Sequence, residues 1–196
     1  MKVLAIDCSA RADGLTARMS KAACDAAAQV GAQVEWICLQ DCKIERCRMC
    51  DPNGWGDCRR LGTCVIADDL GKLVDKLQAA DRLIFATPVY FGDLSESAKA
   101  FTDRLRRTST FPGRRQFLRN LPTLAIAVAG GGGGGIPTCL ASIEKALSVP
   151  GCFLVDMVGV ARRNADYKID TLRLAGQALA GPPHETWPGR DTAGDK

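Results

Sequence analysis

Short apolar runs that alternate with helical patterns restrict the fold of this chain more than any other feature. The runs lie at residues 3–6, 34–39, 83–86, 124–129 and 153–160. A run of this length that is apolar throughout is typical of a strand buried on both faces, as in a parallel sheet. Helical periodicity occupies residues 15–30, 70–77, 94–105, 137–147 and 170–180. The alternation therefore predicts a doubly wound α/β fold, a five-stranded parallel sheet with helices on both faces.

The length of the chain sets its domain organisation. Its 196 residues are ample for one domain and short for two, so we expect one domain over residues 1–180 and a polar tail over residues 181–196. No apolar stretch is long enough to span a membrane, and the chain opens in a strand instead of a secretory signal. We therefore expect a cytoplasmic protein with no membrane partner.

Basic residues do not by themselves indicate a nucleic-acid partner. The net charge of +4 is too small for that inference. Six arginines fall between residues 104 and 119, among Pro, Gly, Thr and Ser. This composition predicts an exposed connection, with phosphate binding or contact with an acidic partner as the alternative.

Histidine and cysteine usage indicate which chemistry to expect. The one histidine, His184, lies in the tail, which argues against Ser-His-Asp and Cys-His catalysis and against a metal site made of several histidines. Ten cysteines in a cytoplasmic chain suggest metal, cluster or redox chemistry more than disulfides. We therefore expect no catalytic side chain, because a cofactor or a cysteine-bound metal would carry the difficult chemistry.

The segment at residues 8–16, between the first strand and the first helix, has the composition of an anion site. A helix N-terminus offers free backbone N–H groups and the positive end of the helix dipole. The hydroxyls of Ser9 and Thr16 are expected to point the same way, and Arg11 would add a cation. An ordinary capped turn is the alternative.

Two later strands also end in loops suited to a ligand. After the third strand, Tyr90 and Phe91 stand between Pro88 and Gly92, either as a packed corner or as a platform beside a flat ligand. After the fourth strand, residues 130–135 are all glycine. Such a run lets the backbone closely approach a flat ligand, with mere flexibility as the alternative.

The strand order 2-1-3-4-5 of flavodoxin-like sheets would make the first, third and fourth strands neighbours. Their three loops would then meet in one crevice, where one suits a phosphate, one offers aromatic rings and one is nearly all backbone. A ligand with one phosphate and a flat conjugated ring fits this crevice, and FMN is the economical choice.

Two of these loops resemble those of a known family. The pattern Ser9-x-Arg11-x-x-Gly14-x-Thr16 is similar to the phosphate loop of NADPH-dependent FMN reductases, and Thr87-Pro-Val-Tyr-Phe-Gly-x-x-Ser95 is similar to their ring-binding loop. The glycine run stands where that family has its third flavin loop. Within the family, the cysteines resemble those of the iron–sulfur flavoproteins. The resemblance spans residues 1–180 and implies a flavodoxin-like fold, FMN at a subunit interface and electron transfer.

The resemblance also implies a set of FMN-binding residues. Those expected at the phosphate are Ser9, Arg11, Gly14 and Thr16. Those expected along the ring are Pro88, Val89, Tyr90, Phe91, Gly92 and Ser95, with Gly130, Gly131 and Gly132 on its other side.

A cysteine-rich insertion at residues 42–64 interrupts the helical pattern. Its spacing is Cys42-x4-Cys47-x2-Cys50-x7-Cys58-x5-Cys64, five cysteines within 23 positions, which indicates soft-metal coordination. The iron–sulfur flavoproteins have C-x2-C-x2-C followed by a fourth cysteine. Here Asn53 occupies the third position, and Cys58 follows only after an insertion at residues 52–57. A [4Fe–4S] cluster, a metal-free loop of thiols and a zinc site are the alternatives.

If a [4Fe–4S] cluster forms, we expect Cys47, Cys50, Cys58 and Cys64 as its ligands. Cys42 would be a bystander because it stands at the end of the second strand, ahead of the turn. The loop would leave the same edge of the sheet as the flavin loops, which would allow electrons to pass between cluster and FMN.

Three functions remain open. The first is an NAD(P)H-dependent flavin oxidoreductase that passes electrons through FMN to an unidentified small-molecule or protein acceptor. The second is an electron carrier with FMN and a cluster but no pyridine-nucleotide activity. The third, a zinc-bearing nucleic-acid module, fits poorly with the small net charge and the flavin loops. Tyr90 and Phe91 look too apolar for an open surface, so we expect a homodimer or a dimer of dimers.

Overall fold

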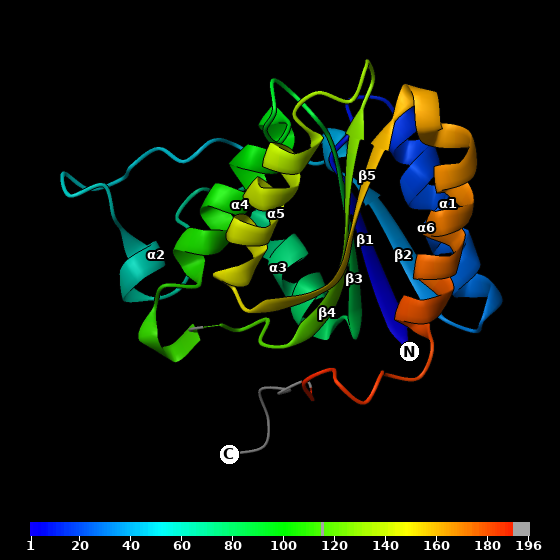
Figure 1. The fold of residues 1–196 in the computed structure, drawn as a ribbon. Coiled ribbons are helices and arrows are strands. Elements are labelled where there is room, and N and C mark those ends of the chain that lie inside the picture. Colours follow the sequence, from blue (N-terminus) through cyan, green and yellow to red (C-terminus); the bar gives the residue numbers. More distant parts are fainter. Residues whose placement is uncertain (115, 190–196) are drawn as a thin grey trace.

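A computed structural model describes residues 1–114 and 116–189. It contains a parallel sheet of five strands in the order β2-β1-β3-β4-β5, with helices on both faces (Figure 1). The predicted flavodoxin-like architecture is therefore confirmed. The strands are β1 (Lys2–Asp7), β2 (Gln33–Cys38), β3 (Arg82–Pro88), β4 (Leu121–Ala129) and β5 (Cys152–Ala161). The α-helices are α1 (Leu15–Gln29), α2 (Asp57–Arg60), α3 (Leu70–Ala79), α4 (Glu96–Thr108), α5 (Ile136–Ser148) and α6 (Ala165–Ala180).

The sheet separates two hydrophobic cores. Helices α1 and α6 cover one face, and α3, α4 and α5 cover the other (Figure 1). All nine residues of β4 are buried, which explains why its sequence is apolar on both faces instead of alternating. Side chains that alternate along β3, such as Ile84 and Phe85, therefore enter opposite cores.

Local sequence signals set several helix boundaries. Helix α1 ends before Gly31, whose φ of +92° closes the turn at little cost for glycine. Helix α4 begins after Ser95, whose hydroxyl accepts a hydrogen bond from the Ala98 amide. Helix α6 begins earlier than the expected residue 170, because the Asn164 Oδ1 accepts a hydrogen bond from the Ala161 amide at 2.7 Å and closes the preceding turn.

The expectation of an exposed arginine-rich connection is wrong for its first part. Helix α4 continues to Thr108, so Arg104, Arg106 and Arg107 are helical. Arg104 is only 1 % exposed. The apolar stripe of this helix continues to Leu105, and a distant carboxylate compensates the buried charge of Arg104, as described below.

The tail is less separate from the domain than its composition suggested. Trp187 packs against the core beneath α1 and α6, with the Arg82 guanidinium 5.7 Å from its ring. The side-chain Nδ2 of Asn120 also donates to the Gly189 carbonyl at 2.8 Å. Residues 190–196 lie outside the described part of the chain.

The cysteine-rich insertion lies away from the sheet. It leaves the end of β2, passes outside α4 and carries α2 at one end of the molecule (Figure 1). No helix in the described residues is both long and apolar enough to cross a membrane.

Candidate functional site

The loops after β1, β3 and β4 meet at one edge of the sheet. Asp7, the last residue of β1, pairs with Ala86 of β3, and Ala86 pairs with Ile126 of β4. The Cys8 amide then donates to the Ala86 carbonyl at 2.8 Å, and the Val89 amide donates to the Val128 carbonyl at 2.9 Å. The predicted crevice is therefore assembled from these three strands.

The start of α1 keeps its backbone donors available. Gly14 occupies the N-cap position, and within the described residues no side chain caps α1 and no acidic residue lies in its first turn. Thr16, in that first turn, is 5 % exposed. Because an uncapped helix N-terminus combines free N–H groups with the positive end of the dipole, this end of α1 is suited to an anion.

The phosphate-loop residues Ser9 and Arg11 are placed differently from each other. The Ser9 hydroxyl is turned inward, where it donates to the Asp7 carboxylate and lies 3.0 Å from the Arg11 carbonyl. The Arg11 guanidinium lies at the surface and pairs with Asp13 at 3.1 Å. The exposed Arg11 side chain is therefore free to turn toward a bound anion, whereas the buried Ser9 hydroxyl holds the loop backbone in place.

Asp7 is a site residue that the sequence pattern did not single out. Its side chain is fully buried and accepts hydrogen bonds from the Ser9 amide at 2.9 Å and the Ser20 hydroxyl at 2.6 Å. The signal available in the sequence was a carboxylate that ends an otherwise apolar strand, directly before the loop.

The ring loop presents its aromatic residues to solvent. Tyr90 is 45 % exposed and Phe91 is fully exposed, with a positive φ of 53°. Paired hydrogen bonds between the backbones of Tyr90 and Asp93, at 2.9 and 3.0 Å, hold this turn. Of the two alternatives, a platform fits this geometry and a packed corner does not.

The glycine run touches the ring loop through one of its last members. A Cβ on Gly135 would lie 2.5 Å from the Gly92 Cα, and both glycines have a φ above +80°. The Thr138 hydroxyl donates to the Gly92 carbonyl at 2.7 Å and secures this contact. Gly130 and Gly131, expected along the ring, face open space, since a Cβ on either would meet nothing within 4 Å. The Gly132 carbonyl accepts a hydrogen bond from Arg163.

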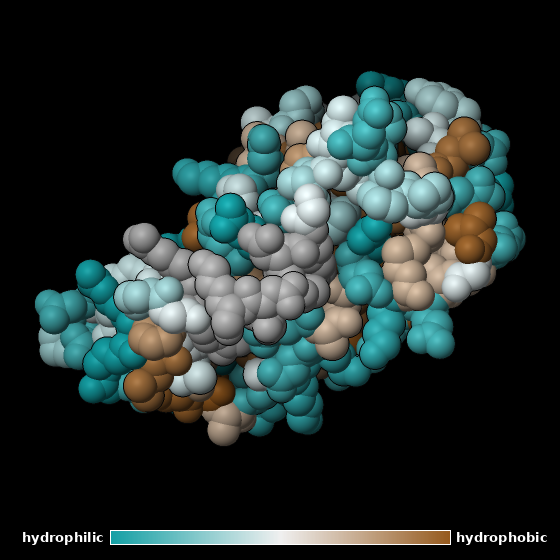
Figure 2. All heavy atoms as spheres, turned by 90° about the horizontal axis from the view of Figure 1, so that it is seen from below, coloured by the Kyte–Doolittle hydropathy of each residue, from teal (hydrophilic) through white to brown (hydrophobic). Residues whose placement is uncertain are grey.

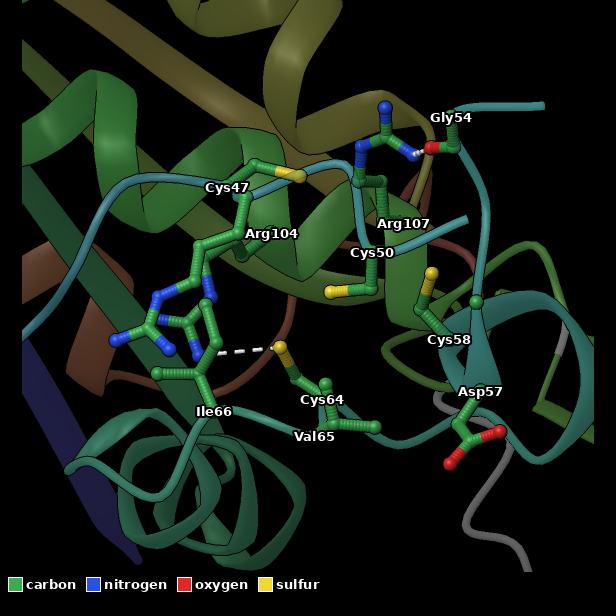
Figure 3. A pocket seen from close by; sticks show the side chains of 12 residues that line it. Cys47, Cys50, Gly54, Asp57, Cys58, Cys64, Val65, Ile66, Arg104 and Arg107 are labelled. Carbon is green, nitrogen blue, oxygen red and sulfur yellow. Dashed lines mark hydrogen bonds between the residues drawn. The ribbon is translucent and has the colours of Figure 1, made fainter. Parts of the chain in front are cut away.

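Four cysteines of the insertion line a single cavity. Cys47, Cys50, Cys58 and Cys64 surround it, and Arg104 and Arg107 of α4 form its wall (Figure 3). The set matches the four expected cluster ligands. Cys42 lies elsewhere, packed against the core under α3 and α4, and its thiol donates to the Cys38 carbonyl at 3.6 Å.

The insertion at residues 52–57 folds back onto α4, which explains how Cys58 reaches the cavity. The Arg107 guanidinium donates to the Gly54 carbonyl at 2.6 Å. It also lies 4.6 Å from the centre of the Trp55 ring, and Arg59 lies 5.5 Å from that ring. The extra residues thus form an anchored turn, and α2 begins at their last residue, Asp57, which is followed by Cys58.

Comparison with known proteins identifies the family. The family model of NADPH-dependent FMN reductases matches residues 1–164. The chain belongs to this family. As a member of this family, the chain is an FMN-dependent oxidoreductase of flavodoxin-like fold.

Individual relatives agree with this assignment. This FMN reductase family member is 31 % identical over 195 residues to an iron–sulfur flavoprotein of Methanocaldococcus jannaschii, with 92 % of this chain and 96 % of the relative covered. It shares its fold with an NAD(P)H:quinone oxidoreductase from Methanothermobacter marburgensis, with a TM-score of 0.67 at 15 % identity over 94 % of this chain and 99 % of the other. It also shares the fold with Megasphaera elsdenii flavodoxin, with a TM-score of 0.57 at 16 % identity over 91 % and 98 %.

The four cavity thiols of this FMN reductase family member are of the ligand type that iron–sulfur clusters use. All ten cysteines are free thiols. Across residues 1–114 and 116–189, no group of three His, Cys, Asp or Glu side chains is already placed to hold a metal ion. A [4Fe–4S] cluster has a wider ring of ligands, because each of its four thiolates binds a different iron. Four thiols line one cavity, so the ligand types for such a cluster are present together.

Burial raises the pKa of several thiols outside this set. Burial raises the pKa of Cys24 to about 12 and that of Cys139 to about 11, so both thiols stay protonated. Burial also raises the pKa of Cys42. Protonated thiols are poor ligands, which supports a structural role for these three cysteines.

Proposed function

We propose that the protein is an FMN-dependent oxidoreductase that takes electrons from NAD(P)H, or from a small electron donor, and passes them to an acceptor. The observation that carries this proposal is the meeting of three loops at one sheet edge, beside an uncapped helix N-terminus. FMN, when bound, supplies the hydride and electron chemistry. The protein supplies position, shielding from water and electrostatics.

At the phosphate end, the chain offers the first backbone N–H groups of α1, the Thr16 hydroxyl and the surface cation of Arg11. The sequence contains one such loop and no credible second nucleotide signature, which favours FMN over FAD or a dinucleotide as the resident cofactor. Asp7 would affect phosphate binding indirectly, because its carboxylate fixes the loop backbone through the Ser9 amide.

At the ring end, the turn from Val89 to Gly92 and the glycine run would border the ring from two sides. The contact between Gly92 and Gly135 holds these two segments together at the crevice. Gly130 and Gly131 leave open space at the end of β4, where a flat ring could approach the backbone.

The exposed aromatic residues support a homodimer or a dimer of dimers. Tyr90 and Phe91 are the large apolar side chains beside the crevice, and they would cover a ring only from one side. A second copy of the chain placed against them would bury both the aromatic residues and the open face of the ring. A monomer in sedimentation at micromolar concentration, with FMN bound, would contradict this assembly.

The cysteine cavity supports a [4Fe–4S] cluster as a second redox centre. Its four lining thiols and the naming of the relatives as iron–sulfur flavoproteins both favour a cluster over a metal-free loop or zinc. Ser95, beside the flavin loops, precedes the first residue of α4, and Arg104, in the wall of the cysteine cavity, lies nine residues later, or about 14 Å along the helix. The cavity thus lies beside α4, away from the sheet edge where the flavin loops are.

An electron carrier without pyridine-nucleotide activity is the second candidate function, and the similarity to flavodoxin in fold favours it. The deciding experiment is anaerobic mixing of the purified holoprotein with NADPH and, separately, with NADH. Bleaching of the flavin absorbance near its usual visible bands with either nucleotide, followed by turnover on addition of a quinone, would support the oxidoreductase. Bleaching only with dithionite or a reduced iron–sulfur protein would favour the carrier. A purified protein without flavin would contradict both.

A further inference from the structure

Arg104 is the most completely buried cation in the described part of the chain, and it lies in the wall of the cysteine cavity (Figure 3). A buried guanidinium is costly unless its donors are satisfied and its charge is compensated. Each contact of Arg104 therefore indicates why the residue is tolerated there.

Asp68 compensates the charge. Its side chain is itself fully buried, and its two carboxylate oxygens accept from both terminal nitrogens of Arg104, with Nη2 and Oδ1 3.0 Å apart. Asp68 also accepts from the Glu45 amide at 2.9 Å and from the Leu70 amide at 3.2 Å. The Arg104 Nη1 donates to the Glu45 carbonyl at 2.9 Å. The pair thus ties both ends of the cysteine-rich segment to α4.

The same guanidinium reaches a sulfur. Its Nη2 lies 3.2 Å from the Sγ of Cys64, one of the four cysteines around the cavity. Its Nε is buried and, within the described residues, has no hydrogen-bond partner. A guanidinium held on one side by Asp68, with Nη2 on the Cys64 sulfur, brings positive charge to the wall of the cavity.

We propose that Arg104 is a positioning residue for the cluster, which holds the Cys64 sulfur and raises the cluster's reduction potential. This inference rests on the proposed cluster. Hydrogen bonds and positive charge at a ligand sulfur favour the reduced form, because reduction adds negative charge to the cluster. Asp68 opposes this effect, so the two partners of the ion pair act on the potential in opposite directions.

Arg107 provides a matched comparison from the same helix. It lines the same cavity and tethers the insertion, but it donates to the Gly54 carbonyl and stacks on Trp55 instead of contacting a sulfur. A residue that acts only as a tether should affect how firmly iron is held without changing the potential. Arg106, which does not line the cavity, serves as the neutral control.

The experiment is a redox titration of protein loaded anaerobically with iron and sulfide, followed by electron paramagnetic resonance, with iron counted per chain. Arg104→Lys keeps the charge, but an ammonium cannot donate to Asp68 and to the Cys64 sulfur as the planar guanidinium does. We therefore expect a more negative reduction potential. Asp68→Asn removes the opposing charge, so we expect a more positive potential. Arg107→Lys should lose iron faster with an unchanged potential, and Arg106→Lys should match the wild type.

Opposite shifts in the Arg104 and Asp68 variants would support the proposal, since loosening of the loop alone would move both the same way. Unchanged potentials, or shifts of the same sign, would overturn it while leaving the cluster itself intact. If Arg104→Lys holds no iron, the shift in the potential of Asp68→Asn decides: a more positive potential supports the proposal, and an unchanged or more negative one overturns it. If the wild type holds no iron, the proposed cluster fails, and this inference fails with it.

Discussion

The Ser95 hydroxyl donates a hydrogen bond to the Cys8 carbonyl at 3.0 Å, which joins the ring loop to the phosphate loop across 87 positions of sequence. The same oxygen accepts from the Ala98 amide at 3.3 Å and caps α4. One side chain therefore starts the helix that borders the cysteine cavity and fixes the spacing of the two flavin loops. The parts of the site depend on one another through this residue.

Replacement of Ser95 by Ala should both destabilise the protein and weaken FMN binding. Loss of the helix cap costs about 1 kcal/mol, and the buried hydrogen bonds of the Ser95 hydroxyl with the Cys8 carbonyl and the Thr87 hydroxyl add to that. Ser97→Ala is the matched control, because Ser97 also donates to the Cys8 carbonyl, at 3.1 Å, but caps nothing. Urea unfolding and fluorescence titration with FMN measure the two effects. A Ser97 variant as impaired as the Ser95 variant would contradict this role.

Replacement of Gly135 by Ala should separate the ring loop from the glycine run. A residue with a side chain at a φ of +81° costs about 1–3 kcal/mol, and the new Cβ would also clash with Gly92. Gly134→Ala is the control, since a Cβ there meets nothing within 4 Å and should change stability by less than about 0.5 kcal/mol. Thermal unfolding and FMN titration would test the pair. Equal effects of the two substitutions would show that the close approach is unimportant.

The cysteine ligands can be tested by removing Cys58 and Cys42 separately. Cys58→Ala should abolish bound iron and the broad visible absorbance that accompanies it, because Cys58 lines the cavity. Cys42→Ala should retain both, because Cys42 packs into the core. Iron and sulfide assays under anaerobic conditions give the answer. Retention with the Cys58 variant and loss with the Cys42 variant would mean that the cluster uses Cys42.

The buried pair of Asp68 and Arg104 should make stability depend on pH in the acid range. Burial alone would raise the pKa of Asp68, but the hydrogen bonds from Arg104 and from two backbone amides outweigh it and lower the pKa. The stabilisation is therefore complete above the ordinary carboxyl pKa of about 4 and is lost as the pH falls through the folded-state value.

Asp68→Asn should consequently cost about 3–5 kcal/mol near neutral pH, and its difference from the wild type should shrink toward about pH 2. Asp69→Asn is the neighbouring control. Asp69 pairs with Lys72 at the surface, so its replacement should lower the free energy of unfolding far less. Urea unfolding across this pH range measures both. A constant difference at every pH would contradict the lowered pKa.

The sheet and the flavin loops could be predicted because their signals are local. Continuous apolar runs identify strands buried on both faces, and Ser95 stands directly before an amphipathic helix. The flavodoxin-like strand order was the expectation under which the three loops converge in one crevice. The four thiols around the cavity could be predicted from their spacing. The spacing did not predict that the insertion would fold against Arg107 and so bring Cys58 to the cavity.

The parts that could not be predicted depend on partners far apart in sequence. Arg104 looked like a member of an exposed arginine run, because nothing near it in the chain reveals that Asp68, 36 positions earlier, would compensate its charge. Arg107 and Gly54 are similarly 53 positions apart. All six glycines of residues 130–135 look equivalent, and only the packing distinguishes Gly135 as the one that touches Gly92.

Apolar surface on the cysteine-rich end is another feature that composition hides. Figure 2, which views the molecule from the edge where the strands begin, shows apolar side chains gathered on the protruding end that carries α2. Leu61 and Val65, which follow α2, are 59 % and 54 % exposed. Val65 lies between Cys64 and Ile66, so its sequence neighbours do not indicate that its side chain is exposed.

The central claim is that the N-terminus of α1 binds the phosphate of FMN, and a comparison of FMN with riboflavin in wild-type and Thr16→Glu protein tests it most directly. Riboflavin lacks the phosphate, so the wild type should prefer FMN. A carboxylate at position 16 would face the phosphate and should weaken FMN binding by about tenfold or more, with little change for riboflavin. Thr186→Glu, at an exposed site in the tail, is the control, and circular dichroism checks that α1 stays folded. Loss of the preference for FMN in the Thr16 variant alone is the predicted result. An undiminished preference for FMN in that variant would place the phosphate elsewhere and contradict the account.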